Sequence, residues 1–105
     1  MSNVGISLNA VSAAPTWGGI VTFDAPKSNI GIQMIPSQTN GTVSVYGSLD
    51  GVTFSPLTGL ASVGSGFNPS LAAQAGVPVI AARAHLDAIG TTVGSAFMTV
   101  WVTGY

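Results

Sequence analysis

Charged residues are the scarcest component of this 105-residue chain. It has 2 residues of lysine or arginine, 3 of aspartate or glutamate and 1 histidine, so that 5% of the chain is charged, against about 25% in a typical soluble domain. This is too few for the surface of a free-living soluble monomer. A net charge of −1 with 2 cationic residues also argues strongly against a nucleic-acid partner, since binding to phosphates depends on lysine and arginine.

Other features that the sequence lacks exclude further classes of protein. Without cysteine there is no disulfide, no thiolate metal site and no cysteine nucleophile. Uninterrupted apolar runs stay far below the roughly 18 to 20 residues of a membrane-spanning helix, so no membrane span is expected. The first ten residues lack the features of a signal peptide. Disorder fits poorly, because 47% of the residues are hydrophobic and they alternate regularly. The remaining explanation is a folded protein whose surface is covered by neighbouring proteins.

The apolar residues that are present alternate with a period of two, which is typical of β-strands. Strands are predicted at residues 3–10, 18–26, 28–36, 41–49, 52–57, around 60–63, 77–89 and 96–105. Pro26 and Pro36 should end the second and third strands. Residues 70–75 should form one helical turn at most, and residues 90–95 a turn. These short strands predict an all-β fold, a single antiparallel β-sandwich domain over residues 1–105, of jelly-roll or immunoglobulin-like type with seven to eight short strands.

Alternation also predicts which side chains share a face. Val4, Ile6 and Leu8 should share one face of the first strand. In the strand 77–89 the two faces are Ile80, Ala82, Ala84, Leu86 and Ala88 against Arg83, His85 and Asp87. In the last strand they are Met98, Val100 and Val102 against Phe97, Thr99, Trp101, Thr103 and Tyr105.

Asp50 and Gly51 form a strong hairpin signal within "GSLDGVTFSPL". A type I′ turn needs positive φ at both central residues, which Asp-Gly readily adopts. This two-residue turn would place Gly47 opposite Phe54 and Val45 opposite Pro56. A turn role for Asp50 therefore explains the motif without any binding or catalytic function.

The second half of the chain resembles a known pattern. "VSVYGSLDGVTFSPL", followed by "AARAHLDAI" and "FMTVWVTGY", resembles small β-sandwich proteins of tailed-phage virions, with an S-x-D-G-x-[TSN]-[FW] hairpin and an arginine-bearing strand. The resemblance covers residues 41–105 and implies a capsid decoration protein or a tail or fibre component, often trimeric. The hairpin is also similar to that of discoidin-like jelly rolls, but this chain has neither the cysteines nor the basic loops common in that family.

Candidate functional residues are few, and none forms a catalytic constellation. Arg83, His85 and Asp87 form one charged row, which makes a poor metal site because only one histidine and one carboxylate are at hand. We expect no catalytic residue, no metal and no cofactor. Trp17, Arg83, His85, Asp87, Trp101 and Tyr105 are the predicted interface residues, since tryptophan and tyrosine are favoured interface anchors. Phe97 and Trp101 could equally belong to the core.

The sequence therefore predicts a non-enzymatic structural protein located in a virus particle. The first interpretation is a bacteriophage capsid decoration protein, a homo-oligomer such as a trimer, that packs against itself and a major capsid or tail protein. The alternative is a carbohydrate- or receptor-binding β-sandwich module of a tail or fibre.

Overall fold

Strands of very unequal length build this chain, which a computed structural model describes over residues 3–90 and 96–105. The predicted turn at 90–95 falls almost wholly outside these residues. The described elements are β1 (Val4–Val11), β2 (Thr16–Trp17), β3 (Val21–Ser37), β4 (Gly41–Ser48), β5 (Ser55–Pro56), the 3-10 helix η1 (Thr58–Leu60), β6 (Val63–Ser65), β7 (Ser70–Ile89) and β8 (Phe97–Gly104).

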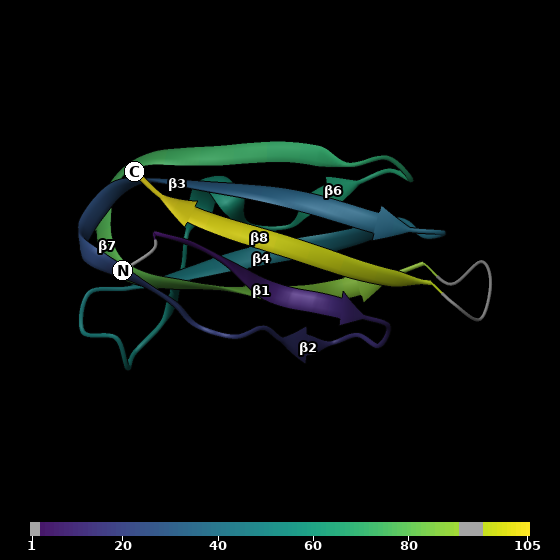
Figure 1. Cartoon of the computed structure of the whole chain (residues 1–105), viewed down its shortest axis with the longest axis horizontal. Coiled ribbons are helices and arrows are strands. Elements are labelled where there is room, and N and C mark those ends of the chain that lie inside the picture. The colour runs from purple at the N-terminus through teal and green to yellow at the C-terminus, as the bar shows by residue number, and fades with distance from the viewer. Residues whose placement is uncertain (1–2, 91–95) are drawn as a thin grey trace.

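The all-β, antiparallel prediction is confirmed. The strand order is β1-β8-β3-β7-β4-β5, with β2 added to β7 and β6 to β4, and every pairing is antiparallel. β3 and β7 are long enough to bend, as Figure 1 shows at the left of the molecule, and each contributes to two layers. The first layer contains β1, β8, residues 29–37 of β3 and residues 70–75 of β7. The second contains β2, residues 21–27 of β3, residues 79–89 of β7, β4, β5 and β6.

The two layers enclose one hydrophobic core. Met98, Val100 and Val102 of β8 are buried on one side, and Ala82, Ala84 and Leu86 of β7 on the other, as the alternation predicts. Ile30, Ile32 and Met34 of β3 are buried with them. Phe97 and Trp101 point outward from β8, since they alternate with these core residues, and Trp101 is 37% exposed. A core role for Trp101 is therefore wrong.

The predicted break at Pro26 is also wrong, because β3 runs through it as one strand. Pairing of β3 with β7 shifts register between Thr22 and Lys27 and again between Lys27 and Asn29. Proline is tolerated at such irregular positions because its missing N–H is not needed by a regular ladder. The two predicted strands are thus halves of one bent strand, and "short strands" is wrong for both β3 and β7.

The segment predicted as a helical turn is instead the beginning of β7. Residues 70–75 pair with residues 29–34 of β3, and Gly76, with a φ of 103°, marks the irregularity that follows. The strand predicted around residues 60–63 lies slightly later, as β6, and η1 comes before it. Alanine-rich sequence favours helix only weakly, and pairing with β3 outweighs that preference.

The predicted common face of Val4, Ile6 and Leu8 is wrong because β1 contains a bulge. Ile6 lies opposite Trp101 but Leu8 lies opposite Val100, so Ser7 is the extra residue. Leu8 consequently points into the core, whereas Val4 and Ile6 are exposed on the outer side.

Asp50 and Gly51 do lie where the chain reverses, but the predicted two-residue hairpin is wrong. Tyr46 pairs with Pro56 and Gly47 with Ser55, one residue away from the predicted register. Gly51 has a φ of 78°, whereas Asp50 is not among the residues with positive φ, so a type I′ turn is excluded. Asp50 instead accepts hydrogen bonds from the backbone N–H groups of Val52 and Thr53, which organises a longer loop.

Candidate functional site

Four of the predicted interface residues meet on the outer side of the second layer. β2 pairs with β7 so that Trp17 lies opposite His85, and the two ring centroids are 4.4 Å apart. Tyr46 of β4 approaches Trp17 edge-on at 4.7 Å. We call this group, with Phe54, Arg83 and Asp87, the Trp17 cluster. Trp17 itself is 50% exposed, so the cluster reaches the surface.

Arg83 is held inside the Trp17 cluster. Its guanidinium carbon lies 5.0 Å from the Trp17 ring centroid and 5.7 Å from that of Phe54, both within the range of cation–π attraction. Nε and Nη2 both donate to the carbonyl oxygen of Gly18, at 3.0 and 2.7 Å. The arginine thus fixes the segment after β2 to the sheet.

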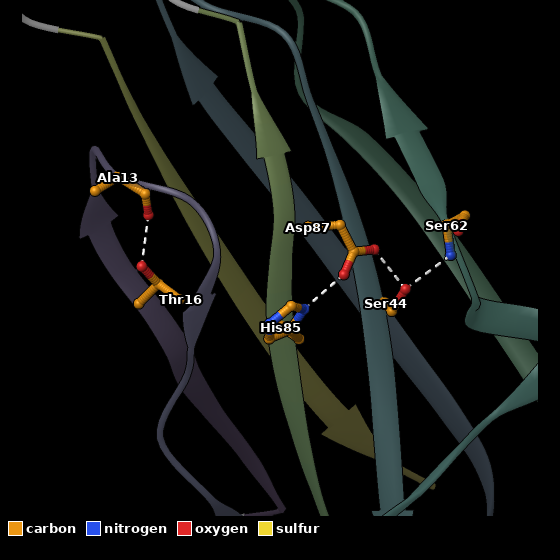
Figure 2. A network of polar contacts seen from close by, with 6 residues as sticks. All are labelled: Ala13, Thr16, Ser44, Ser62, His85 and Asp87. Atoms are coloured by element: carbon orange, nitrogen blue, oxygen red, sulfur yellow. Dashed lines mark hydrogen bonds and ion pairs between the residues drawn. The ribbon is translucent and has the colours of Figure 1, made fainter.

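His85 and Asp87 belong to a short chain of hydrogen bonds (Figure 2). His85 Nδ1 lies 2.5 Å from Asp87 Oδ1, Ser44 Oγ donates to Asp87 Oδ2 at 2.5 Å, and the Ser62 N–H donates to Ser44 Oγ at 3.0 Å. A register shift makes this possible: Val43 pairs with Leu86 and Thr42 with Ala88, so Asp87 is an extra residue without a partner across the strand.

This arrangement differs from that of a hydrolytic triad. In a triad the imidazole lies between the hydroxyl and the carboxylate, so that it can take the hydroxyl proton. Here the carboxylate of Asp87 bonds to both Ser44 and His85, and the hydroxyl donates to this carboxylate and not to the imidazole. Among residues 3–90 and 96–105, no group of three or more histidine, cysteine, aspartate or glutamate side chains could hold a metal ion. In the same residues no helix is long and apolar enough to cross a membrane.

The position of Trp17 depends on two small residues. The Gly18 N–H donates to the Ala84 carbonyl at 2.8 Å, and a Cβ on Gly18 would lie 2.6 Å from the Ser7 backbone oxygen. Ser7 Oγ accepts from the Ala84 N–H at 2.8 Å and donates to the Gly19 carbonyl at 2.7 Å. The bulge in β1 therefore anchors the loop that carries Trp17, and only glycine fits at position 18.

Trp101 and Tyr105 lie elsewhere, on the outer side of the first layer. Cross-strand pairing places Ile6, Trp101, Gln33 and Leu71 in one row. Val4, Thr103, Gly31 and Ala73 form the next. We call these residues, with Tyr105, the apolar face. Leu71 is 79% exposed and Tyr105 62%, and Val4 and Ile6 are exposed as well.

A hollow of about 590 Å³ crosses the apolar face. Gly31 and Ala73 keep its floor low, and Trp101, Tyr105 and Leu71 are among its walls. Gln33 and Thr103 supply its polar side chains, and none of the described residues that line it is charged. A hollow of this size with aromatic walls can take either a partner's side chains or a small neutral ligand.

The predicted interface residues therefore fall into two separate groups. Sequence reasoning missed Tyr46 and Phe54 in the Trp17 cluster and Ser44, which bonds to it through Asp87. Tyr46 and Ser44 alternate with the core residues of β4, which is a usable signal. It also missed Val4, Ile6 and Leu71 of the apolar face. Their exposure depends on the bulge at Ser7 and on the unpredicted beginning of β7, neither of which has a clear local signal.

Comparison with known proteins supports the fold alone. No protein-family model matches the sequence, and no curated protein matches it. The SPBc2 prophage-derived protein YomS has a similar structure, with a TM-score of 0.65 and 9% identity over 97% of this chain and 91% of that one. A pectin binding carbohydrate binding module also has a similar structure, with a TM-score of 0.61 and 16% sequence identity. The match covers 85% of this chain and 66% of the module, so this chain spans just under two thirds of the module's length.

A third similarity is weaker. A chain from the structure of infectious bursal disease virus Gx strain gives a TM-score of 0.44 with 13% identity, over 95% of this chain and 31% of that one. The two closer similarities show that this small β-sandwich also occurs in a prophage-derived protein and in a carbohydrate-binding module.

Proposed function

We propose that this chain is a non-enzymatic structural protein of a bacteriophage particle, a capsid decoration protein that packs against neighbouring protein through its apolar face. One observation carries the proposal: large exposed hydrophobic side chains gather on one sheet face from which charge is absent among the described residues. These are Val4, Ile6, Leu71, Trp101 and Tyr105. Contiguous exposed apolar surface of this kind is typical of interaction sites.

Two further observations support the proposal. The similarity to the prophage-derived protein extends over nearly all of both chains, so the whole domain and not a fragment is shared. In the order Ser44, Asp87, His85 the hydroxyl is bonded to the carboxylate and not to the imidazole, so the usual Ser–His activation is not formed, which supports a non-enzymatic role. Interfaces are enriched in tryptophan and tyrosine and depleted in charge at their centre, as the apolar face is.

The experiment is to look for the chain in purified particles. Particles from the source culture would be banded on a density gradient and analysed by quantitative mass spectrometry. We expect the chain to band with the major capsid protein in a fixed ratio, and Trp101→Lys to abolish rebinding to particles stripped of the chain. A matched Thr22→Lys change, at an exposed site on the second layer, should leave rebinding intact. Absence of the chain from banded particles would contradict the proposal.

A carbohydrate-binding module is the second candidate, and the hollow is the observation that favours it. Sugar rings commonly pack on aromatic side chains, and Trp101 and Tyr105 flank a hollow that also holds Gln33 and Thr103. The similar carbohydrate-binding module binds pectin. The absence of cations from the described lining favours a neutral saccharide over an anionic one such as pectin.

Titration separates the two candidates. Trp101 fluorescence, recorded in a Trp17→Phe background, would be followed during addition of cellohexaose and, separately, of polygalacturonate. Saturable binding of cellohexaose that Tyr105→Ala weakens would favour the second candidate. No response to either saccharide, together with rebinding to particles, would favour the first.

A further inference from the structure

The first six residues of β7 form an edge of the first layer. Residues 70–75 pair with β3 on one side, and no described strand pairs with them on the other. On the opposite edge of this layer, the Gly19 N–H donates to the Ser7 carbonyl of β1. The edge formed by residues 70–75 has no such backbone partner among the described residues.

The direction of its backbone groups follows from the pairing of β3. Asn29 and Tyr105 exchange backbone hydrogen bonds of 3.1 and 2.9 Å, so the odd-numbered residues of β3 bond to β8. In an antiparallel sheet the alternate residues bond to the other side, which pairs Ile30 with Gln74 and Ile32 with Ala72. The N–H and C=O groups of Leu71, Ala73 and Ala75 consequently point out of the sheet.

Nothing in the described part of the chain covers these groups. Gln74 accepts a hydrogen bond from the Gly59 N–H, but through its side chain, which leaves the backbone edge free. Proteins usually protect such an edge with lysine, proline or a bulge. Residues 70–75 contain neither lysine nor proline, and the irregularity at Gly76 lies beyond them.

We propose that this edge pairs with the same edge of a second copy of the chain. Antiparallel pairing around a two-fold axis at Ala73 brings each Ala73 opposite the other and each Leu71 opposite an Ala75, a large residue against a small one. Each opposed pair then exchanges two backbone hydrogen bonds. Residues 70–75 are uncharged, so no like charges meet in this register.

This pairing rests on the proposed function, because it identifies a second copy of the chain as one of the neighbouring proteins against which the chain packs. The two-fold axis is perpendicular to the sheet, so the first layers of the two copies join into one sheet and both apolar faces lie on the same side. Leu71, the edge residue of the apolar face, then lies at the centre of a doubled surface. That surface remains free for a larger shell.

The test is the molar mass of the isolated chain together with amide exchange. We expect a dimer of twice the 10.4 kDa chain mass by light scattering, with the amides of Leu71, Ala73 and Ala75 protected in the dimer and unprotected on dilution. Ala73→Pro should abolish the dimer and leave the fold intact, since the Ala73 N–H points away from β3. Ala73→Ser keeps that N–H and should dimerise normally.

Two variants with opposite charges at position 73 test the pairing independently of any folding defect in the proline variant. Ala73→Lys and Ala73→Glu should each raise the dimer dissociation constant by about fivefold, because like charges then lie directly opposite. Mixing the two should restore the wild-type value. A chain that is monomeric at all concentrations, or a dimer that Gln33→Lys in the middle of the face disrupts while Ala73→Pro does not, would overturn the pairing. Either result leaves the banding of the chain with particles as a separate question.

Discussion

At the scale of single residues, Asp50 shows how a carboxylate can serve structure alone. Its Oδ1 accepts from the Val52 N–H, the Thr53 N–H and Ser48 Oγ, each at 2.8 Å. These bonds favour the ionised form, with the Thr53 amide contributing most, and they lower the pKa of Asp50 to about 2. The carboxylate therefore needs no ligand to explain its position.

The pH dependence of stability follows from this lowered pKa. Because the folded-state pKa lies below the ordinary value of about 3.9, the stabilisation is complete above pH of about 4 and disappears as the pH falls towards 2. Carbon-detected NMR titration should place the Asp50 transition near pH 2, and Ser48→Ala should move it upward. In the Asp50→Asn variant, the free energy of unfolding measured in urea should depend less on pH between pH of about 4 and 2 than in the wild type. A midpoint near 3.9 for Asp50 would contradict this account.

At the scale of elements, the alternating sequence was sufficient to predict the strands but not how they join. β8 was predicted with the correct buried face, because burial of one face imposes a period of two. In β7 the predicted buried face is confirmed for Ala82, Ala84 and Leu86. It is wrong for Ala88, which is exposed beyond the extra residue Asp87. The Asp50 loop was assigned the wrong register because the dipeptide is compatible with more than one turn. The longer loop is instead stabilised by side-chain bonds of Asp50 and Ser48 to its backbone N–H groups.

The long bent strands β3 and β7 could not be predicted from the local sequence, for a different reason. Residues 70–75 are mostly small and uncharged, and they become a strand only because residues 29–34 lie alongside. Ser7 likewise becomes a bulge only because Gly19 and Ala84 bond to it. The apolar face depends on both features. Trp101 and Tyr105 could thus be named from the sequence, but their neighbours could not.

Gly76 permits the bend in β7, and its replacement tests that role. Its φ of 103° is unfavourable for residues with a side chain, while the space around it is open, so Gly76→Ala acts on the backbone alone. We expect the variant to lose about 1 to 2 kcal/mol of unfolding free energy in urea. Gly64→Ala is the matched control, since its Cβ also enters open space and its φ is outside the left-handed region. Equal stability of the two variants would show that the bend does not depend on Gly76.

At the scale of the whole molecule, the few charges are segregated. Asp24 and Lys27 form an ion pair of 3.0 Å near the bend of β3, and this contact lowers the pKa of Asp24. Asp50 lies in a loop, and Arg83 and Asp87 lie in the Trp17 cluster. The chain exposes 5081 Å², or about 1,000 Å² for each charged residue, and none of these charged residues lines the hollow of the apolar face. This distribution supports the proposed contact with protein through that face.

The two tryptophans report separately on the two outer sides of the sandwich. Trp17 is 50% exposed in its cluster and Trp101 is 37% exposed on the apolar face, so acrylamide should quench both in the isolated chain. Trp17→Phe leaves only Trp101 as a fluorophore, and Trp101→Phe leaves only Trp17. When the chain binds to stripped particles through its apolar face, quenching of Trp101 should fall towards that of a buried indole while quenching of Trp17 stays unchanged. Protection of Trp17 with continued exposure of Trp101 would instead place the contact at the Trp17 cluster.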